Sequence, residues 1–223
     1  MCGRFTITSG LSEIAARFNC ERKLINFQPR YNVAPTQQVP VVINSEGNNL
    51  LEMMRWGLVP NWVKDPSIGI KMINARAETV TEKPVFKTLF RKKRCIIPAD
   101  GYYEWQKVGK SKIPMRIVHK SRGIFALAGL WDVWQPPNGE SLFSFTILTT
   151  EPVNSVQAVH NRMPVILRPE NEQLWLNNLL NSPSDNAFLL SLIEPVQELE
   201  AYRVSTLVNS PANDRTECIL PIY

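Results

Sequence analysis

The chain has 223 residues, 44% of them hydrophobic and 20% charged, and its formal net charge is +5 at pH 7. That length supports a substantial core, and because no linker, repeat or low-complexity run interrupts the sequence, we expect a single domain over residues 1–223. The absence of an 18-residue apolar run and of a signal-peptide pattern argues against a membrane or secreted protein, so we expect a cytoplasmic one with no membrane contact.

Short elements are expected from the first residues onward, because 17 prolines divide the chain. Residues 11–18 have apolar side chains at helical spacing and predict a helix capped by Ser9 or Ser12. Residues 39–56 predict two strands around a Gly-Asn turn.

The middle of the chain changes from helical to extended patterns. Residues 78–92 predict a helix that Pro84 breaks or delays. Four runs rich in β-branched and aromatic residues then predict strands, at residues 94–107, 112–119, 124–134 and 142–150. Gly, Pro and Asn turns separate them, so we expect a mixed or antiparallel sheet, closed into a barrel.

The last third predicts mostly helices. Thr150 can cap a short helix over 151–159, with His160 just beyond its end. The remaining predicted elements are two helices and a final strand, at residues 170–180, 185–194 and 199–205. The expected fold class is therefore α+β, a single domain with a mixed or antiparallel, barrel-like β core flanked by short helices.

Common cofactor and metal signatures are absent from the sequence. The four cysteines lie far apart without a CxxC pair, and only His119 and His160 accompany them, which argues against zinc and against a disulfide framework. No dinucleotide, P-loop, zinc-protease or serine-hydrolase motif occurs. We expect neither a metal nor a cofactor.

Positive charge is concentrated in the first part of the chain. Residues 1–130 hold 21 Lys and Arg against 9 Asp and Glu, whereas residues 131–223 hold 4 against 11. The runs FRKKRC, GKSK and HKSR are local clusters of the kind that nucleic-acid binding proteins present. Such runs are more often solvated helix or strand ends, so both interpretations stay open.

Cys2 follows the initiator methionine, and aminopeptidases generally remove Met1 when the next side chain is this small. The mature chain would begin with an α-amine of pKa about 8 beside a thiol of pKa about 8.5, which a cation or helix end could bring to thiolate near neutrality. This pair suits acyl transfer by an N-terminal nucleophile, or condensation with an aldehyde to an imine that the thiol closes into a thiazolidine. A small buried residue on a first strand is the alternative, and position alone favours it.

Two further segments place polar side chains together. Asn74 and Arg76 point to the same face of an extended chain, which suits an amide beside a phosphate-binding arginine. Glu104 lies among tyrosines and a tryptophan, where lost hydration would raise its pKa and make it a general acid near neutrality. The alternatives are an Asx turn with a surface arginine, and an outward-facing strand glutamate near Lys107.

His160 and the aromatic residues complete the candidate set. His160 suits proton transfer at physiological pH, and Arg162 on the same face could hold phosphate, although a polar loop residue is the more common role for a lone histidine. We assign Trp56 to packing and Trp62 to the surface, where an exposed tryptophan beside cations can stack on an unpaired base. His119 is assigned to the surface.

Seven short motifs follow one another along the chain: MCGRF, RYNVAPTQ, RWGLVPNW, MINARAET, RCIIPADGYYEW, AGLW and HNRMPVIL. Together they closely resemble the SOS response-associated peptidase (SRAP) family of abasic-site processing proteins, over residues 2–210, with 211–223 left as a C-terminal tail. The resemblance implies a sensor of abasic sites in single-stranded DNA, including single-strand/double-strand junctions, that crosslinks to them in the DNA damage response and shields them from strand cleavage. One departure is that Val63 follows Trp62, where some relatives have an aromatic pair.

The resemblance also implies residue roles. Cys2 would form the thiazolidine with the ring-opened deoxyribose aldehyde, and Asn74 would orient the sugar and the attacking terminus. Glu104 would promote ring opening and proton transfer, and His160 would assist the imine chemistry. The residues that the resemblance places on DNA are Arg4, Asn32, Pro35, Trp62, Arg76 and Arg162.

Three other activities stay open at this point. Class II glutamine amidotransferases also begin with a mature cysteine, so an N-terminal nucleophile amidase is the alternative enzyme. A module that coats single strands without a covalent step is the non-enzymatic alternative. The family name also leaves open a peptidase activity by which the protein removes its own Met1. We expect the protein to be a monomer.

Overall fold

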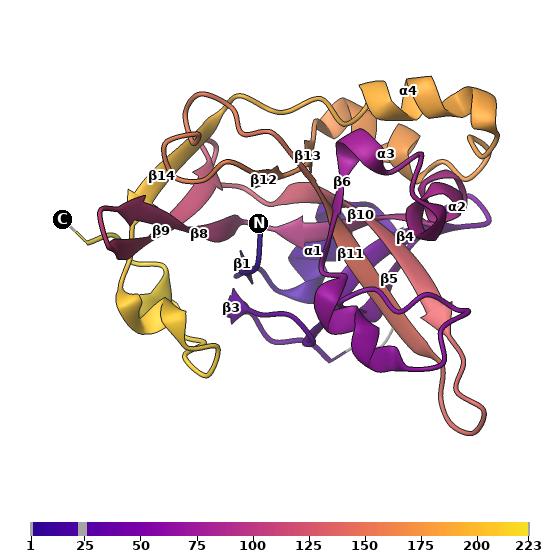
Figure 1. Cartoon of the computed structure of the whole chain (residues 1–223), viewed down its shortest axis with the longest axis horizontal. Helices are drawn as coiled ribbons and strands as arrows, with labels where there is room; N and C mark the ends of the chain where they lie inside the picture. Colours follow the sequence, from indigo (N-terminus) through magenta and orange to yellow (C-terminus); the bar gives the residue numbers. More distant parts are fainter. Residues whose placement is uncertain (1, 22–25, 223) are drawn as a thin grey trace.

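Five strands close into a barrel at the centre of the fold (Figure 1). The computed structural model describes residues 2–21 and 26–222. The barrel strands are β4 (Gln38–Ser45), β5 (Asn48–Trp56), β7 (Arg94–Ala99), β10 (Phe125–Trp134) and β11 (Leu142–Thr150). They pair in the ring order β4–β5–β11–β10–β7–β4, and only the closing pair, β5 with β11, is parallel. The predicted α+β class with a barrel-like core is confirmed.

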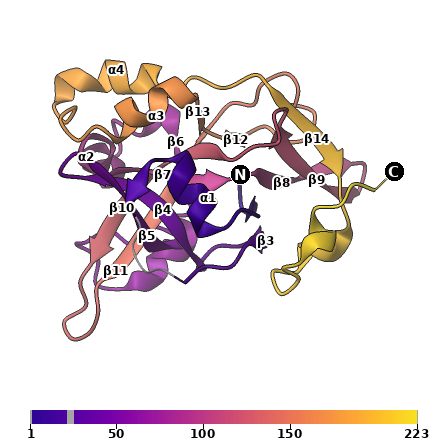
Figure 2. The ribbon, with the colours of Figure 1, turned by 180° about the vertical axis from the view of Figure 1, so that it is seen from behind.

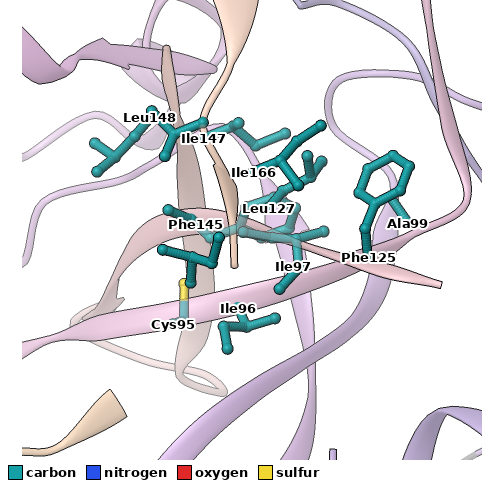
Figure 3. Packing of buried hydrophobic residues seen from close by; sticks show 14 of the residues in the cluster. Cys95, Ile96, Ile97, Ala99, Phe125, Leu127, Phe145, Ile147, Leu148 and Ile166 are labelled. Atoms are coloured by element: carbon teal, nitrogen blue, oxygen red, sulfur yellow. The ribbon is translucent and has the colours of Figure 1, made fainter. Parts of the chain in front are cut away.

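Apolar side chains from this ring fill the core. Figure 3 shows Leu127, Phe145 and Ile147 packed together with neighbours from β7, and all three are fully buried. Trp56 at the end of β5 lies beneath them, with its ring stacked on that of Phe145 at 6.4 Å between centroids. The prediction that Trp56 belongs to the core is confirmed.

A second sheet carries the start of the chain. Its order is β14 (Leu199–Arg203), β9 (Ser111–His119), β8 (Gly101–Val108), β1 (Phe5–Ile7) and β3 (Arg30–Val33). Seen from behind, β3 and the N-terminus lie between the barrel and the β8–β9 hairpin (Figure 2). Strand β8 follows β7 after one residue, so the chain passes directly from the barrel into this sheet.

The residue at that junction, Asp100, holds β1 in place. Its carboxylate accepts hydrogen bonds from the Thr6 hydroxyl at 2.5 Å, from the Thr8 hydroxyl at 2.6 Å and from Arg116 Nη2 at 2.9 Å. A Cβ on Gly101 would lie 2.6 Å from Arg116 Nε, so the guanidinium reaches Asp100 only because Gly101 has no side chain. This buried ion pair fixes the strand that leads back to Cys2.

Short strands extend the barrel sheet, and 3-10 helices lie in the connections. The short strands are β2 (Cys20–Glu21), β6 (Asn74–Arg76), β12 (Met163–Pro164) and β13 (Ile166–Leu167). The 3-10 helices are Pro66–Lys71, Ala77–Thr79, Pro183–Asp185, Thr206–Asn209 and Thr216–Cys218. The predicted hairpin at 39–56 is confirmed, but its turn lies at Glu46 and Gly47, where φ is 53° and 90°.

Four α-helices cover the sheets: α1 (Leu11–Arg17), α2 (Pro84–Lys92), α3 (Pro169–Leu176) and α4 (Asn186–Ser191). Helix α1 is confirmed, but Gly10 is its N-cap and no side chain caps it. Helix α2 begins at Pro84, as expected for a proline that delays a helix, because its missing N–H costs nothing in the first turn. No helix within residues 2–21 and 26–222 is both long and apolar enough to cross a bilayer.

The predicted helix over residues 151–159 is wrong. The segment forms successive turns, in which the Val153 carbonyl accepts from both Val156 N and Gln157 N. A segment this short gains little from helix propagation, so its tertiary contacts decide its path. The predicted helices 170–180 and 185–194 exist but are shorter, at α3 and α4.

Candidate active site

Cys2 lies just before β1, and its backbone is fixed from the barrel. The side-chain amide of Asn74, on β6, donates to the Cys2 carbonyl oxygen at 2.8 Å. Strand β6 is in turn paired with β11, with Asn74 opposite Ile147. Asn74 Oδ1 is buried, and within the described part of the chain it has no hydrogen-bond partner, so this oxygen can accept from a ligand.

The Cys2 thiol is fully buried. Burial, reinforced by the Glu104 carboxylate, raises the pKa of the thiol well above its usual range. In this environment burial outweighs the groups that lower the pKa of the thiol, so the thiol is protonated at neutral pH. Chemistry at the thiol needs a nearby base to take its proton.

Glu104 on β8 is that nearby carboxyl. Its residue is only 4% exposed, and burial raises its pKa from 4.5 to about 7. The alternative of an outward-facing strand glutamate is excluded by this burial. Because this pKa lies near neutrality, the group can donate or accept a proton at physiological pH.

His160 lies beside Glu104, with its Nδ1 3.9 Å from Glu104 Oε1. The Arg162 N–H donates to Nδ1 at 3.0 Å, which places the proton of the neutral ring on Nε2. On protonation the same nitrogen can donate to the Arg162 carbonyl at 3.1 Å. Burial lowers the pKa of His160, which favours the neutral ring.

The loop that carries His160 is tied to the strand that carries Glu104. Gln106 on β8 donates to the Ala158 carbonyl at 3.1 Å. A cleft of about 580 Å³ opens over the two catalytic candidates, and its lining is formed by Glu104, Trp105, Lys107, Lys112, His160 and Asn209. Residues of the β8–β9 hairpin, the His160 loop and the 3-10 helix Thr206–Asn209 thus meet around this cleft.

Two of the predicted DNA-binding residues have structural partners instead of open surfaces. Arg4 donates to Asn32 Oδ1 at 2.9 Å and to the Val208 carbonyl at 2.7 Å, and its guanidinium lies over the Trp105 ring. Asn32 is fully buried, and its amide donates to the carbonyls of Val208, Ser210 and Asn213. In this structure both side chains hold the segment around the 3-10 helix Thr206–Asn209 against β3, and Asn32 has no exposed atom to offer to DNA.

The other four predicted DNA-binding residues differ in accessibility. Trp62 is 69% exposed, as expected, whereas Pro35 is half-buried in a turn. Arg76 is exposed on β6. Arg162 forms a bidentate pair with Glu78, at 2.7 and 2.9 Å, and also donates to the Thr149 carbonyl at 2.6 Å.

The basic run FRKKRC is largely structural. Arg94 is buried and donates to carbonyls in the last turns of α2 and α3, including Trp175 O at 2.6 Å and Phe90 O at 2.9 Å. Lys93 forms an ion pair with the buried Asp132 at 2.6 Å. Two of the four cations in this run therefore stabilise the fold and are not available to a polyanion.

Sequence reasoning missed Glu78, Lys107, Lys112 and Asn209 as residues of the site. Glu78 is visible in MINARAET, but its partner Arg162 lies 84 positions away, so no local pattern reveals the pair. Lys112 was recognised only as part of the basic run GKSK, and Lys107 only as a neighbour of an outward-facing Glu104. The described part of the chain holds no group of three His, Cys, Asp or Glu side chains that could bind a metal ion.

Together, the fold and the site define a closed-barrel protein with a cleft along β8, the strand that pairs with β1 just after Cys2. The chain belongs to the SOS response-associated peptidase (SRAP) family, whose model matches residues 1–211. It is 50% identical to the abasic site processing protein YoqW of Bacillus subtilis, over 98% of this chain and 99% of that protein. It is 35% identical to the abasic site processing protein HMCES of Xenopus tropicalis, over 88% of this chain and 67% of that protein.

A solved structure has the same fold. The crystal structure of a Bacteroides thetaiotaomicron protein matches with a TM-score of 0.84 at 32% sequence identity, and it covers 99% of this chain and 100% of that chain. The closed barrel and the appended sheet are therefore an architecture that an experimentally determined protein shares.

Proposed function

We propose that this protein processes abasic sites in single-stranded DNA by forming a thiazolidine between Cys2, exposed as the N-terminus by loss of Met1, and the aldehyde of the opened deoxyribose. The observation that carries the proposal is that Asn74 holds the Cys2 carbonyl while Glu104, which acts electrostatically on the Cys2 thiol, lies beside His160. The similar proteins named for abasic site processing support it.

The reaction begins with the sugar. An abasic deoxyribose is mostly a closed hemiacetal, and protonated Glu104 promotes its opening to the aldehyde. The Cys2 amine attacks the aldehyde carbon, and loss of one water gives the imine. Asn74 holds the Cys2 carbonyl during this step, and its free Oδ1 can accept a hydrogen bond from the sugar.

The thiol then closes the ring. The sulfur bonds to the imine carbon, the C=N π electrons pass to nitrogen, and nitrogen gains a proton. Because the buried thiol is protonated at neutral pH, its proton must go to a base, and the Glu104 carboxylate, beside neutral His160, is suited to take it. The net change is loss of one water, with no cofactor or metal.

DNA binding in this proposal uses positive charge and one exposed ring. Arg76 is exposed on β6 near Asn74, where it would contact a phosphate. Arg162, beside β12, would contact a phosphate in place of its ion pair with Glu78, and Trp62 would stack on an unpaired base. Arg4 and Pro35 would contact the same DNA strand. Single-strand/double-strand junctions are the proposed natural targets, and the protein would act as a monomer.

The amidase alternative has less support. Both reactions use the Cys2 thiol after a base takes its proton, but the similar proteins are named for abasic site processing. Incubation with glutamine and with abasic DNA separates the two activities, since only the amidase releases ammonia. A non-covalent coating module would be unaffected by Cys2→Ala, which our proposal expects to bind DNA without forming an adduct.

Intact-mass spectrometry tests the proposal. We expect the purified protein to lack Met1, and the mixture with uracil-excised single-stranded DNA to contain a species of protein plus DNA less one water. A fully competent protein that keeps Met1, or a bond at another side chain, would refute the proposal. Retention of Met1 in Glu104→Gln, produced in cells without methionine aminopeptidase activity on it, would show that the protein removes its own methionine.

A further inference from the structure

Two lysines face each other across the β8–β9 hairpin at the mouth of the cleft. Lys107 and Lys112 are register partners in this antiparallel pair, and both are exposed. Both line the same cleft as Glu104 and His160. Like charges placed directly opposite each other destabilise a strand pair. A negative charge bound between the two lysines would relieve this repulsion.

The protein itself supplies no such charge among the described residues. Neither lysine takes part in an ion pair there, and the hairpin sequence KVGKSK contains three lysines and no acidic residue. By contrast, the basic residues Lys93, Arg116 and Arg162 each have a carboxylate partner. The lysine pair is therefore unneutralised at the entrance to a cleft that contains a buried carboxyl and a histidine.

We propose that Lys107 and Lys112 form a phosphodiester-binding site that holds the DNA strand next to the abasic nucleotide. The inference rests on the proposed function and deepens it. Lys107 lies three residues beyond Glu104 on β8, a rise of about 10 Å along the strand. The phosphate in question thus belongs to a nucleotide close to the reacting sugar, and the ammonium groups bind it as point charges without reading its base.

The hairpin also provides a matched control. Lys110 lies at the exposed turn between Lys107 and Lys112 but does not line the cleft. A diffuse electrostatic effect would make all three lysines equivalent, whereas a phosphate site requires only the cleft-lining pair. All three side chains are exposed, so glutamine substitutions leave the core intact.

The first test measures binding to a single-stranded oligonucleotide that contains a stable abasic analogue without an aldehyde. Fluorescence anisotropy over a range of salt concentrations gives the slope of log K against log salt. For Lys107→Gln/Lys112→Gln we expect the slope to fall by about 0.7 for the lost phosphate contact, and affinity at about 0.1 M salt to fall about fivefold. Lys110→Gln should keep the wild-type slope.

The second test locates the phosphate. Replacing single phosphodiesters by uncharged methylphosphonates should identify one position near the analogue that weakens wild-type binding about fivefold but leaves the double variant unchanged. A double variant with the wild-type slope, or a Lys110→Gln variant with an equal loss, would overturn the site. Because the analogue cannot crosslink, a failure of the crosslinking proposal leaves this measurement interpretable on its own.

Discussion

Because Glu104 is buried, we expect its charged form to lower the free energy of unfolding. The variant Glu104→Gln measures this penalty. The pKa of Glu104 is raised from 4.5 to about 7 by burial. The folded state therefore binds the proton more tightly than the unfolded state, so stability falls as pH rises from 4.5 to about 7 and is constant above. At about 1.4 kcal/mol per pKa unit, the penalty above pH 7 is about 3 kcal/mol.

Glutamine has the shape of the protonated glutamic acid and no charge, so it avoids this penalty. Its buried amide needs an acceptor for its N–H groups, which costs about 1–3 kcal/mol where none is found, but that cost does not vary with pH. The free energy of unfolding of Glu104→Gln relative to wild type should thus rise by about 3 kcal/mol between about pH 4.5 and about pH 8.

Urea denaturation of both proteins at the two pH values measures this difference. Glu78→Gln serves as the control of opposite sign, because hydrogen bonding from Arg162 lowers the pKa of Glu78 and its contribution is present at high pH. A relative stability of Glu104→Gln that is the same at both pH values would refute the assigned burial effect. The stabilised variant should at the same time crosslink abasic DNA more slowly.

Four further outcomes follow from the site and the fold. The crosslinking rate of the wild type should be bell-shaped in pH, with a maximum near about 7.5, since it needs a free amine of pKa about 8 and a protonated Glu104; a rate that keeps rising to about pH 9 would contradict this role. Asn74→Ala should slow crosslinking in single-turnover assays while equilibrium DNA binding changes little, and equal losses in both would point to a binding role. Trp62→Ala should weaken single-strand affinity by about 1–3 kcal/mol in anisotropy titrations, with no change in the urea midpoint, because the ring is exposed. Asp100→Ala should lower the free energy of unfolding by about 3–5 kcal/mol, since it leaves a buried arginine unpaired; a loss under about 1 kcal/mol would show that the ion pair is dispensable.

Much of the secondary structure was predictable from local sequence. The β-branched and aromatic runs identified β7 to β11, and Pro84 marked the start of α2, because strand and helix-start preferences act within a few residues. The distinction between buried Trp56 and exposed Trp62 also followed from their local context. The helix predicted over 151–159 was wrong because the tertiary contacts of this segment outweigh its weak helical preference.

The sequence by itself determined which side chains are present and which local chain conformations they favour. Tertiary structure decided where they meet. The parallel pairing of β5 with β11 closes the barrel, Asn74 reaches the Cys2 carbonyl from β6, and His160 reaches Glu104 from a loop. It also decided that Glu104 loses its hydration while Lys107 keeps its own. Burial and charge pairing depend on segments far apart in the chain, so no local pattern contains them.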